Sequence, residues 1–133
     1  MIHYLIIRRD LPFGVTLAQL SHAAANSMED WLKSELYVWF ETLKWPDHKP
    51  MTVVVLGVRD ELTLRRWHKK LTKRKVKHTV VKEPDGGWDN QLMAIGVWPG
   101  DRDKLEPVFK KLNTFSYDNW TGVGEEYEDC GDE

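Results

Sequence analysis

The chain has 133 residues, of which 41% are hydrophobic and 30% charged, and its formal net charge is −2. This length suits one hydrophobic core, and this composition is that of a folded globular protein rather than a disordered one. No apolar run approaches the 18 residues typical of a membrane helix, and the single cysteine, Cys130, excludes an intramolecular disulfide, so a cytoplasmic setting is expected.

The first third of the chain predicts one strand and two helices. Residues 2–8 are apolar and β-branched and end in charges, which is typical of a central strand. Thr16 and Gln19 have the spacing of a capping box, so a helix is expected to begin at Thr16. Its expected core-facing stripe is Leu17, Leu20, Ala24 and Met28. A similar pattern at Ser27 and Asp30 predicts a second helix, whose apolar stripe is Leu32, Leu36, Trp39, Phe40 and Leu43.

Three later segments are rich in β-forming residues and predict strands over 51–58, 77–83 and 91–98. The first of them is nearly all apolar, as expected for a strand that is covered on both faces. Asp60 is expected to cap a helix after it. A last helix is expected over 103–112, where Pro107 is tolerable only if the helix starts late enough to place it in the first turn.

The predicted order is therefore β-α-α-β-α-β-β-α, an α/β fold. We expect a four-stranded mixed sheet with helices on both faces, in which the short link between the last two strands makes them antiparallel. Residues 1–116 would form the domain, and residues 117–133 a loosely held acidic C-terminal tail.

Charge is unevenly distributed along the chain. Nine of the 19 basic residues fall within 65–82: Arg65, Arg66, Lys69, Lys70, Lys73, Arg74, Lys75, Lys77 and Lys82. Six carboxylates lie within 125–133. The basic segment suits a phosphate-bearing partner, or it is an ordinary solvated helix face. The acidic tail is complementary to it, so a further hypothesis is that the tail covers the basic face.

Several segments resemble one family, the type 2 peptidyl-tRNA hydrolases. The strongest are His3–Leu11, an apolar strand followed by a basic residue and Asp-Leu, and Ala18–Ala24, which is similar to a helical Ala-Gln-x-x-His-Ala signature. Two departures stand out: residues 13–17 lack the family's lysine, and Glu83–Gly87 replaces its Asp-Ala-Gly-x-Thr stretch. The pattern is closer to the divergent peptidyl-tRNA hydrolase domain-containing branch.

The resemblance implies hydrolysis of the ester that joins a peptide to the 3′ end of tRNA, with His22, Gln19, and Glu83 or Asp85 as candidate catalytic residues. His22 and Gln19 are three residues apart and so share a helix face, and an imidazole titrates near neutral pH, as a general base requires. Each residue also has a structural reading: a helix-edge histidine, a cap, and a turn around the glycines after Pro84.

A tRNA partner also gives the basic residues a role. The candidate RNA-binding residues are Arg8, Arg9, Lys69, Lys73, Lys77 and Trp88. The five histidines show no metal-ligand spacing, and no phosphate-binding or dinucleotide-binding loop is present, so neither a metal nor a cofactor is expected.

Two other functions remain open. One is a tRNA-binding or RNA-binding module that has lost catalysis, which the missing lysine favours. The other is a protein-interaction domain built on the tryptophan-rich second helix, with a homodimer as one form. Salt dependence separates them, because only a phosphate-driven complex weakens steeply with salt.

Overall fold

The computed structural model describes residues 1–34 and 51–122. Four strands, β1 (Ile2–Arg8), β2 (Thr52–Val58), β3 (His78–Glu83) and β4 (Gln91–Val97), form one sheet in the order β2-β1-β4-β3. β1 pairs with β2 in parallel, and β4 is antiparallel to both β1 and β3. The predicted mixed sheet and antiparallel last pair are confirmed. β1, β2 and β3 all point the same way, so they end together at what we call the carboxyl end of the sheet.

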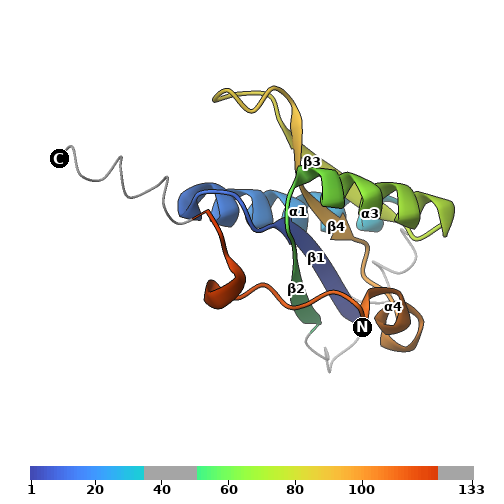
Figure 1. The fold of residues 1–133 in the computed structure, drawn as a ribbon. Coiled ribbons are helices and arrows are strands. Elements are labelled where there is room, and N and C mark those ends of the chain that lie inside the picture. Colours follow the sequence, from blue (N-terminus) through green and yellow to red (C-terminus); the bar gives the residue numbers. More distant parts are fainter. Residues whose placement is uncertain (35–50, 123–133) are drawn as a thin grey trace.

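The helices cover both faces of this sheet, as predicted (Figure 1). α1 (Phe13–Ser34) packs on one face, and α3 (Glu61–Lys73) and α4 (Arg102–Phe109) pack on the other. Over the described residues the order is β-α-β-α-β-β-α, followed by a 3-10 turn at Tyr117–Asn119. Within this part of the chain, no helix has both the length and the apolarity that a membrane crossing requires.

The predicted break between two helices at Ser27 is wrong, because α1 continues through it to Ser34. Ser27 is fully buried, and its hydroxyl donates to the carbonyl oxygen of Ala23 (2.6 Å). That leaves the hydroxyl oxygen to accept from Nε2 of His3 at 2.8 Å. The remainder of the expected second helix falls within 35–50, outside the described residues, so the order β-α-α-β is not what the described chain shows.

The predicted start of α1 is also wrong, and its predicted core face is right only in part, since Leu20 and Ala24 pack against the core but at its margin. The helix begins at Phe13, so Thr16 lies inside it, and the Thr16 hydroxyl donates to the carbonyl oxygen of Pro12 (2.9 Å) rather than capping. Leu17 is 53% exposed. The buried face consists instead of Thr16, Gln19, Ala23, Ser27 and Trp31.

The reason is a close approach between helix and strand at Gly96. A methyl group on Gly96 would lie 2.5 Å from the Ser27 hydroxyl and closer still to the Ala23 carbonyl oxygen. Only small side chains on α1 allow this contact, and the leucines therefore turn to the flanks.

The position of β2 in the sheet explains a third difference. β2 is an edge strand, and its first half is exposed, with Val53 at 54%, so the prediction that it is covered on both faces is wrong for that half. Asp60 caps α3 as predicted, since its carboxylate accepts from the amide of Thr63 (3.0 Å). α4 starts at Arg102, which places Pro107 inside the helix rather than in its first turn.

The chain after α4 runs past the free edge of β2 to the start of α1 (Figure 1, orange to red). The amide of Phe115 donates to the carbonyl oxygen of Val55 (2.8 Å). Further along, the Trp120 indole donates to the carbonyl oxygen of Leu11 (2.7 Å), and the Thr121 amide donates to that of Arg9 (2.8 Å). Residues 117–122, expected to be loosely held, are thus hydrogen-bonded to the body, whereas the six carboxylates within 125–133 lie outside the described part of the chain.

Candidate functional site

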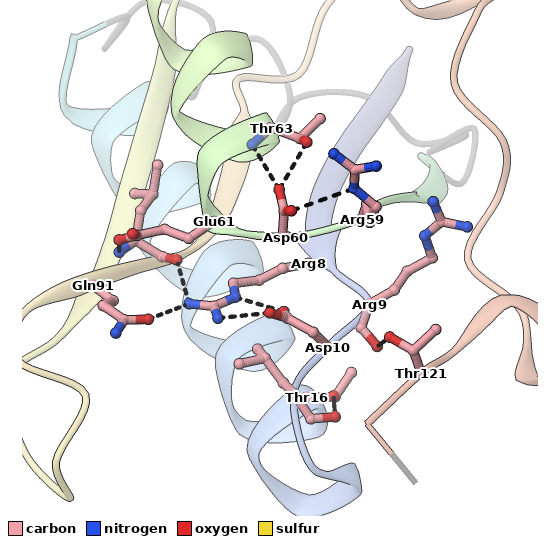
Figure 2. Close-up of polar contacts among 12 residues, drawn as sticks. Arg8, Arg9, Asp10, Thr16, Arg59, Asp60, Glu61, Thr63, Gln91 and Thr121 are labelled. Atoms are coloured by element: carbon pink, nitrogen blue, oxygen red, sulfur yellow. Dashed lines mark hydrogen bonds and ion pairs between the residues drawn. The ribbon is translucent and has the colours of Figure 1, made fainter.

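A buried arginine organises the carboxyl end of the sheet. Arg8 is 5% exposed, and its guanidinium makes two hydrogen bonds to the carboxylate of Asp10, at 2.7 and 2.9 Å (Figure 2). It also donates to Oε1 of Gln91 (2.8 Å) and to the carbonyl oxygen of Leu92 (3.3 Å). The Trp88 ring lies 5.5 Å from the guanidinium carbon. The planar fork of arginine suits this arrangement, because it satisfies a carboxylate on one side and two oxygens on the other.

The same cluster ties α3 to the sheet. Oε2 of Glu61, in the first turn of α3, accepts from the amide of Leu92 (2.8 Å). Glu61 therefore binds the amide of Leu92, at the start of β4, and Arg8 binds the carbonyl oxygen of the same residue. The end of β1, the start of β4 and the start of α3 are fixed relative to one another, as a rigid base for a site requires.

Arg9 and Arg59 place two further cations at this end. Each directly follows the last residue of a strand, and these two strands, β1 and β2, pair in parallel (Figure 2). Arg59 has a side chain that is 76% exposed. Arg9 is half-buried, and its side-chain stem packs over Gly57. Its Nε has no hydrogen-bond partner among the described residues.

His22 lies on α1 with its side chain exposed to solvent. It is in the third turn of α1, about 13 Å along the helix axis from Phe13. No hydrogen bond joins it to Glu83 or Asp85 within the described residues. Solvent water therefore reaches the imidazole, but neither Glu83 nor Asp85, its predicted carboxylate partners, is hydrogen-bonded to it in the described part of the chain.

Gln19 is 4% exposed and faces the sheet. Within the part of the chain that the structure describes, its Oε1 is buried and has no hydrogen-bond partner. An unsatisfied buried oxygen of this kind costs about 1–3 kcal/mol. The structure therefore presents Gln19 as an acceptor without a donor among the described residues, whereas the sequence suggested a catalytic residue or a cap.

The loop between β3 and β4 brings together three of the predicted residues. Glu83, half-buried, ends β3, and its carbonyl oxygen accepts from the amide of Asn90 (2.9 Å), which closes the loop. Asp85 is exposed. Trp88, a candidate RNA-binding residue, is half-buried, packs against the core on the α1 side, and contacts Arg8.

The predicted lysines lie away from this loop. Lys69 and Lys73 are exposed on one side of α3, four residues apart. Lys77, before β3, lies with its ammonium 5.5 Å from the centre of the Trp98 ring. Lys77 also lines a groove of about 470 Å³ at the opposite end of the sheet, together with Lys75, Trp98 and Lys104.

Among the described residues, no group of three or more histidine, cysteine, aspartate or glutamate side chains is arranged to hold a metal ion. Two histidines do meet: Nδ1 of His68 lies 2.8 Å from Nε2 of His78, whose Nδ1 donates to the carbonyl oxygen of Val76. Burial and the neighbouring His78 and Lys82 lower the pKa of His68. The pair is part of the contact between α3 and β3.

Sequence reasoning missed three members of the cluster around Arg8: Asp10, Gln91 and Glu61. It assigned Arg8 to RNA phosphates, but a guanidinium that is buried and bound internally does not support direct phosphate contact. The Arg-x-Asp spacing at the end of β1 was the available signal. Gln91 and Glu61 carried none, because only folding brings residues 83 and 53 positions from Arg8 beside it.

Comparison with known proteins identifies a family. A family model described as peptidyl-tRNA hydrolase PTH2 matches residues 1–115, which span the whole sheet and all three described α-helices. No match was found among curated proteins. Because the matched region covers most of the chain, the chain belongs to the PTH2 family, the type 2 peptidyl-tRNA hydrolases.

Proposed function

We propose that this chain hydrolyses the ester bond between a peptide, or an N-blocked amino acid, and the 3′ ribose of tRNA. The observation that carries the proposal is the family match over residues 1–115. It is supported by the rigid polar cluster around Arg8 at the carboxyl end of the sheet, where α/β folds place their sites.

In this reaction His22 is the general base. It takes a proton from water as the water oxygen adds to the ester carbonyl carbon. It then returns the proton to the ribose oxygen as the carbon–oxygen bond breaks. The exposure of His22 gives water access to the imidazole. Gln19 is assigned a positioning role, because its Oε1 is buried on the sheet side of α1 and not beside the exposed imidazole of His22.

The remaining residues position the substrate. We assign Glu83 and Asp85 to orienting the imidazole once substrate is bound, since catalytic hydrogen bonds are often long before that point. Arg9, Lys69, Lys73 and Lys77 contact phosphates. Arg8 does not touch RNA in this proposal; it holds Asp10 and Trp88 in place at the carboxyl end of the sheet.

The test is release of an N-blocked aminoacyl group from tRNA. Wild type should cleave, and His22→Ala should lose at least about 100-fold in rate, the scale of a general base. Asn26→Ala is the matched control, because Asn26 is exposed one turn further along α1 and has no assigned role. Equal activity of His22→Ala and wild type would remove His22 from the mechanism.

A second candidate function is a tRNA-binding or RNA-binding module without catalysis. The specific observation in its favour is the absence of lysine from residues 13–17, the first turns of α1. It predicts that clean wild-type protein binds tRNA with a steep salt dependence but releases no acyl group. Cleavage that His22→Ala abolishes would exclude it.

A further inference from the structure

Three aromatic rings form a continuous patch where the C-terminal segment meets α1. The Trp120 ring lies 5.6 Å from the ring of Phe13 and 6.0 Å from that of Tyr117, measured between ring centres. Tyr117 is 74% exposed and Phe13 is 47% exposed. Leu17, one turn after Phe13 on α1, is 53% exposed and extends the patch. We call these four residues the aromatic patch.

Hydrogen bonds from residues 120 and 121 to the loop between β1 and α1 hold the patch in place. The Trp120 indole donates to the carbonyl oxygen of Leu11 (2.7 Å), and Thr121 donates to that of Arg9 through both its amide and its hydroxyl. Gly122 then packs against the Leu11 carbonyl group so closely that no side chain fits there. These anchors fix the rings beside the loop that joins β1 to α1.

This location adjoins the candidate active site and carries positive charge. Leu11 directly follows Asp10, which Arg8 holds, and Arg9 supplies both a cation and the carbonyl group that anchors Thr121 (Figure 2). Arg59, the residue after the partner strand β2, has a side chain that is 76% exposed and donates from Nε to the Asp60 carboxylate (3.3 Å), which leaves its terminal nitrogens toward solvent. Exposed rings beside cations are what proteins use to bind single-stranded nucleic acid, because every base has a face that stacks and every linkage carries a phosphate.

Two of the three rings lie outside the region that the family model matches. That region ends at residue 115, whereas the patch depends on Tyr117 and Trp120. The patch therefore depends on residues beyond the matched region.

We propose that the aromatic patch stacks the unpaired bases at the 3′ end of tRNA and so guides the ester-bearing ribose toward the site. This inference rests on the proposed function for the identity of the nucleic acid. The cations at Arg9 and Arg59 pair with the phosphates of the same single strand. The ring of Tyr117, the most exposed of the three, contributes most to stacking.

The experiment uses the full chain and a tRNA that carries 2-aminopurine in place of its 3′-terminal adenine. Stacking on an aromatic ring quenches the fluorescence of this base. Wild type and Tyr117→Phe, which keeps the ring, should quench it and bind alike. Tyr117→Ala should bind about 5-fold or more weaker, the scale of one base–aromatic stacking interaction, and should quench less. Tyr117 is exposed, so its substitution leaves the fold intact, which the melting temperature checks.

A tRNA without its unpaired 3′ nucleotides provides the second arm. Wild type and Tyr117→Ala should bind it equally, since the bases that reach the patch are gone. Equal quenching by the two proteins, or an equal loss of affinity for both tRNAs, would overturn the inference. A change in self-association caused by Tyr117→Ala without a change in quenching would assign the patch to contacts between copies of the chain and would likewise overturn it.

These outcomes are separate from a failure of the proposed function. If wild type cleaves N-blocked aminoacyl-tRNA but Tyr117→Ala changes neither quenching nor affinity, only the inference fails. If wild type does not cleave but quenching depends on the Tyr117 ring, hydrolysis fails and the patch stands as a binding site for single-stranded ends.

Discussion

Replacing Arg8 by methionine tests whether its cluster stabilises the fold as the contacts imply. Methionine keeps the apolar stem against Trp88 but removes the hydrogen bonds to Asp10, Gln91 and the Leu92 carbonyl group. A buried acceptor left without a donor costs about 1–3 kcal/mol. The side chain of Asp10 is 34% exposed, so water satisfies part of what it loses. We therefore expect Arg8→Met to lower the free energy of unfolding by about 3 kcal/mol, the lower end of the roughly 3–5 kcal/mol that breaking a fully buried ion pair costs.

The assay is chemical denaturation at pH 7 of wild type, Arg8→Met, Asp10→Asn and the double variant. Because Arg8 and Asp10 share two hydrogen bonds, the double variant should be more stable than the sum of the single losses predicts, by about 1 kcal/mol or more. Thermal unfolding should shift by roughly 10 °C for Arg8→Met, at about 3–4 °C per kcal/mol for a domain of this size.

Two results would refute this reasoning. A loss below about 1 kcal/mol for Arg8→Met would mean that the oxygens find other donors. Additive losses for the two single variants, within about 0.5 kcal/mol, would mean that the Arg8–Asp10 contact contributes nothing of its own.

Four further outcomes follow from the structure. Gly96→Ala should destabilise the protein by about 1–3 kcal/mol through overpacking against α1, and an unchanged denaturation midpoint would contradict the close approach. Burial lowers the pKa of His3, so the folded protein disfavours the protonated imidazole. The free energy of unfolding should therefore be constant above the unfolded-state pKa of about 6.5 and should fall as the pH decreases below it. In denaturation at pH 7.5 and 5.5, His3→Gln should show a smaller loss than wild type, and an equal loss would assign the effect elsewhere. Replacing Lys69 and Lys73 by glutamine should reduce the slope of log affinity for tRNA against log salt by about 0.9 for each phosphate that a lysine no longer neutralises, whereas an unchanged slope would place the phosphates elsewhere. Deleting residues 125–133 should tighten tRNA binding if the acidic tail competes with phosphates, and unchanged affinity would count against that hypothesis.

The sequence by itself determined the strands, the capped α3 and the family. A run such as residues 2–8 has few alternatives to a central strand, because its β-branched apolar side chains need cover on both faces. Asp60 was recognisable as a cap because a cap is a local interaction over three residues. The apolar first strand with its basic residue and Asp-Leu, together with the Gln-x-x-His-Ala pattern, carried the family resemblance, and the match over residues 1–115 confirms it.

For α1, periodicity of apolar residues was misleading. The pattern pointed to Leu17 and its neighbours as the core face, but the helix packs through Ala23 and Ser27 because Gly96 lets the backbones approach closely. A serine can lie in such a contact since its hydroxyl bonds to its own helix and to His3. None of this is visible without knowing which strand lies beneath the helix.

In the candidate site, too, some residues were identifiable from the sequence and others only from the tertiary structure. His22 and Gln19 were identifiable from their spacing and the family resemblance, and their roles stay proposals. The cluster of Arg8 with Asp10, Gln91 and Glu61 was decided by tertiary structure alone, as was the patch formed by Phe13, Tyr117 and Trp120. The physical reason is that local rules act over a few residues, whereas these contacts join positions up to about a hundred residues apart and exist only after the sheet has set its strand order.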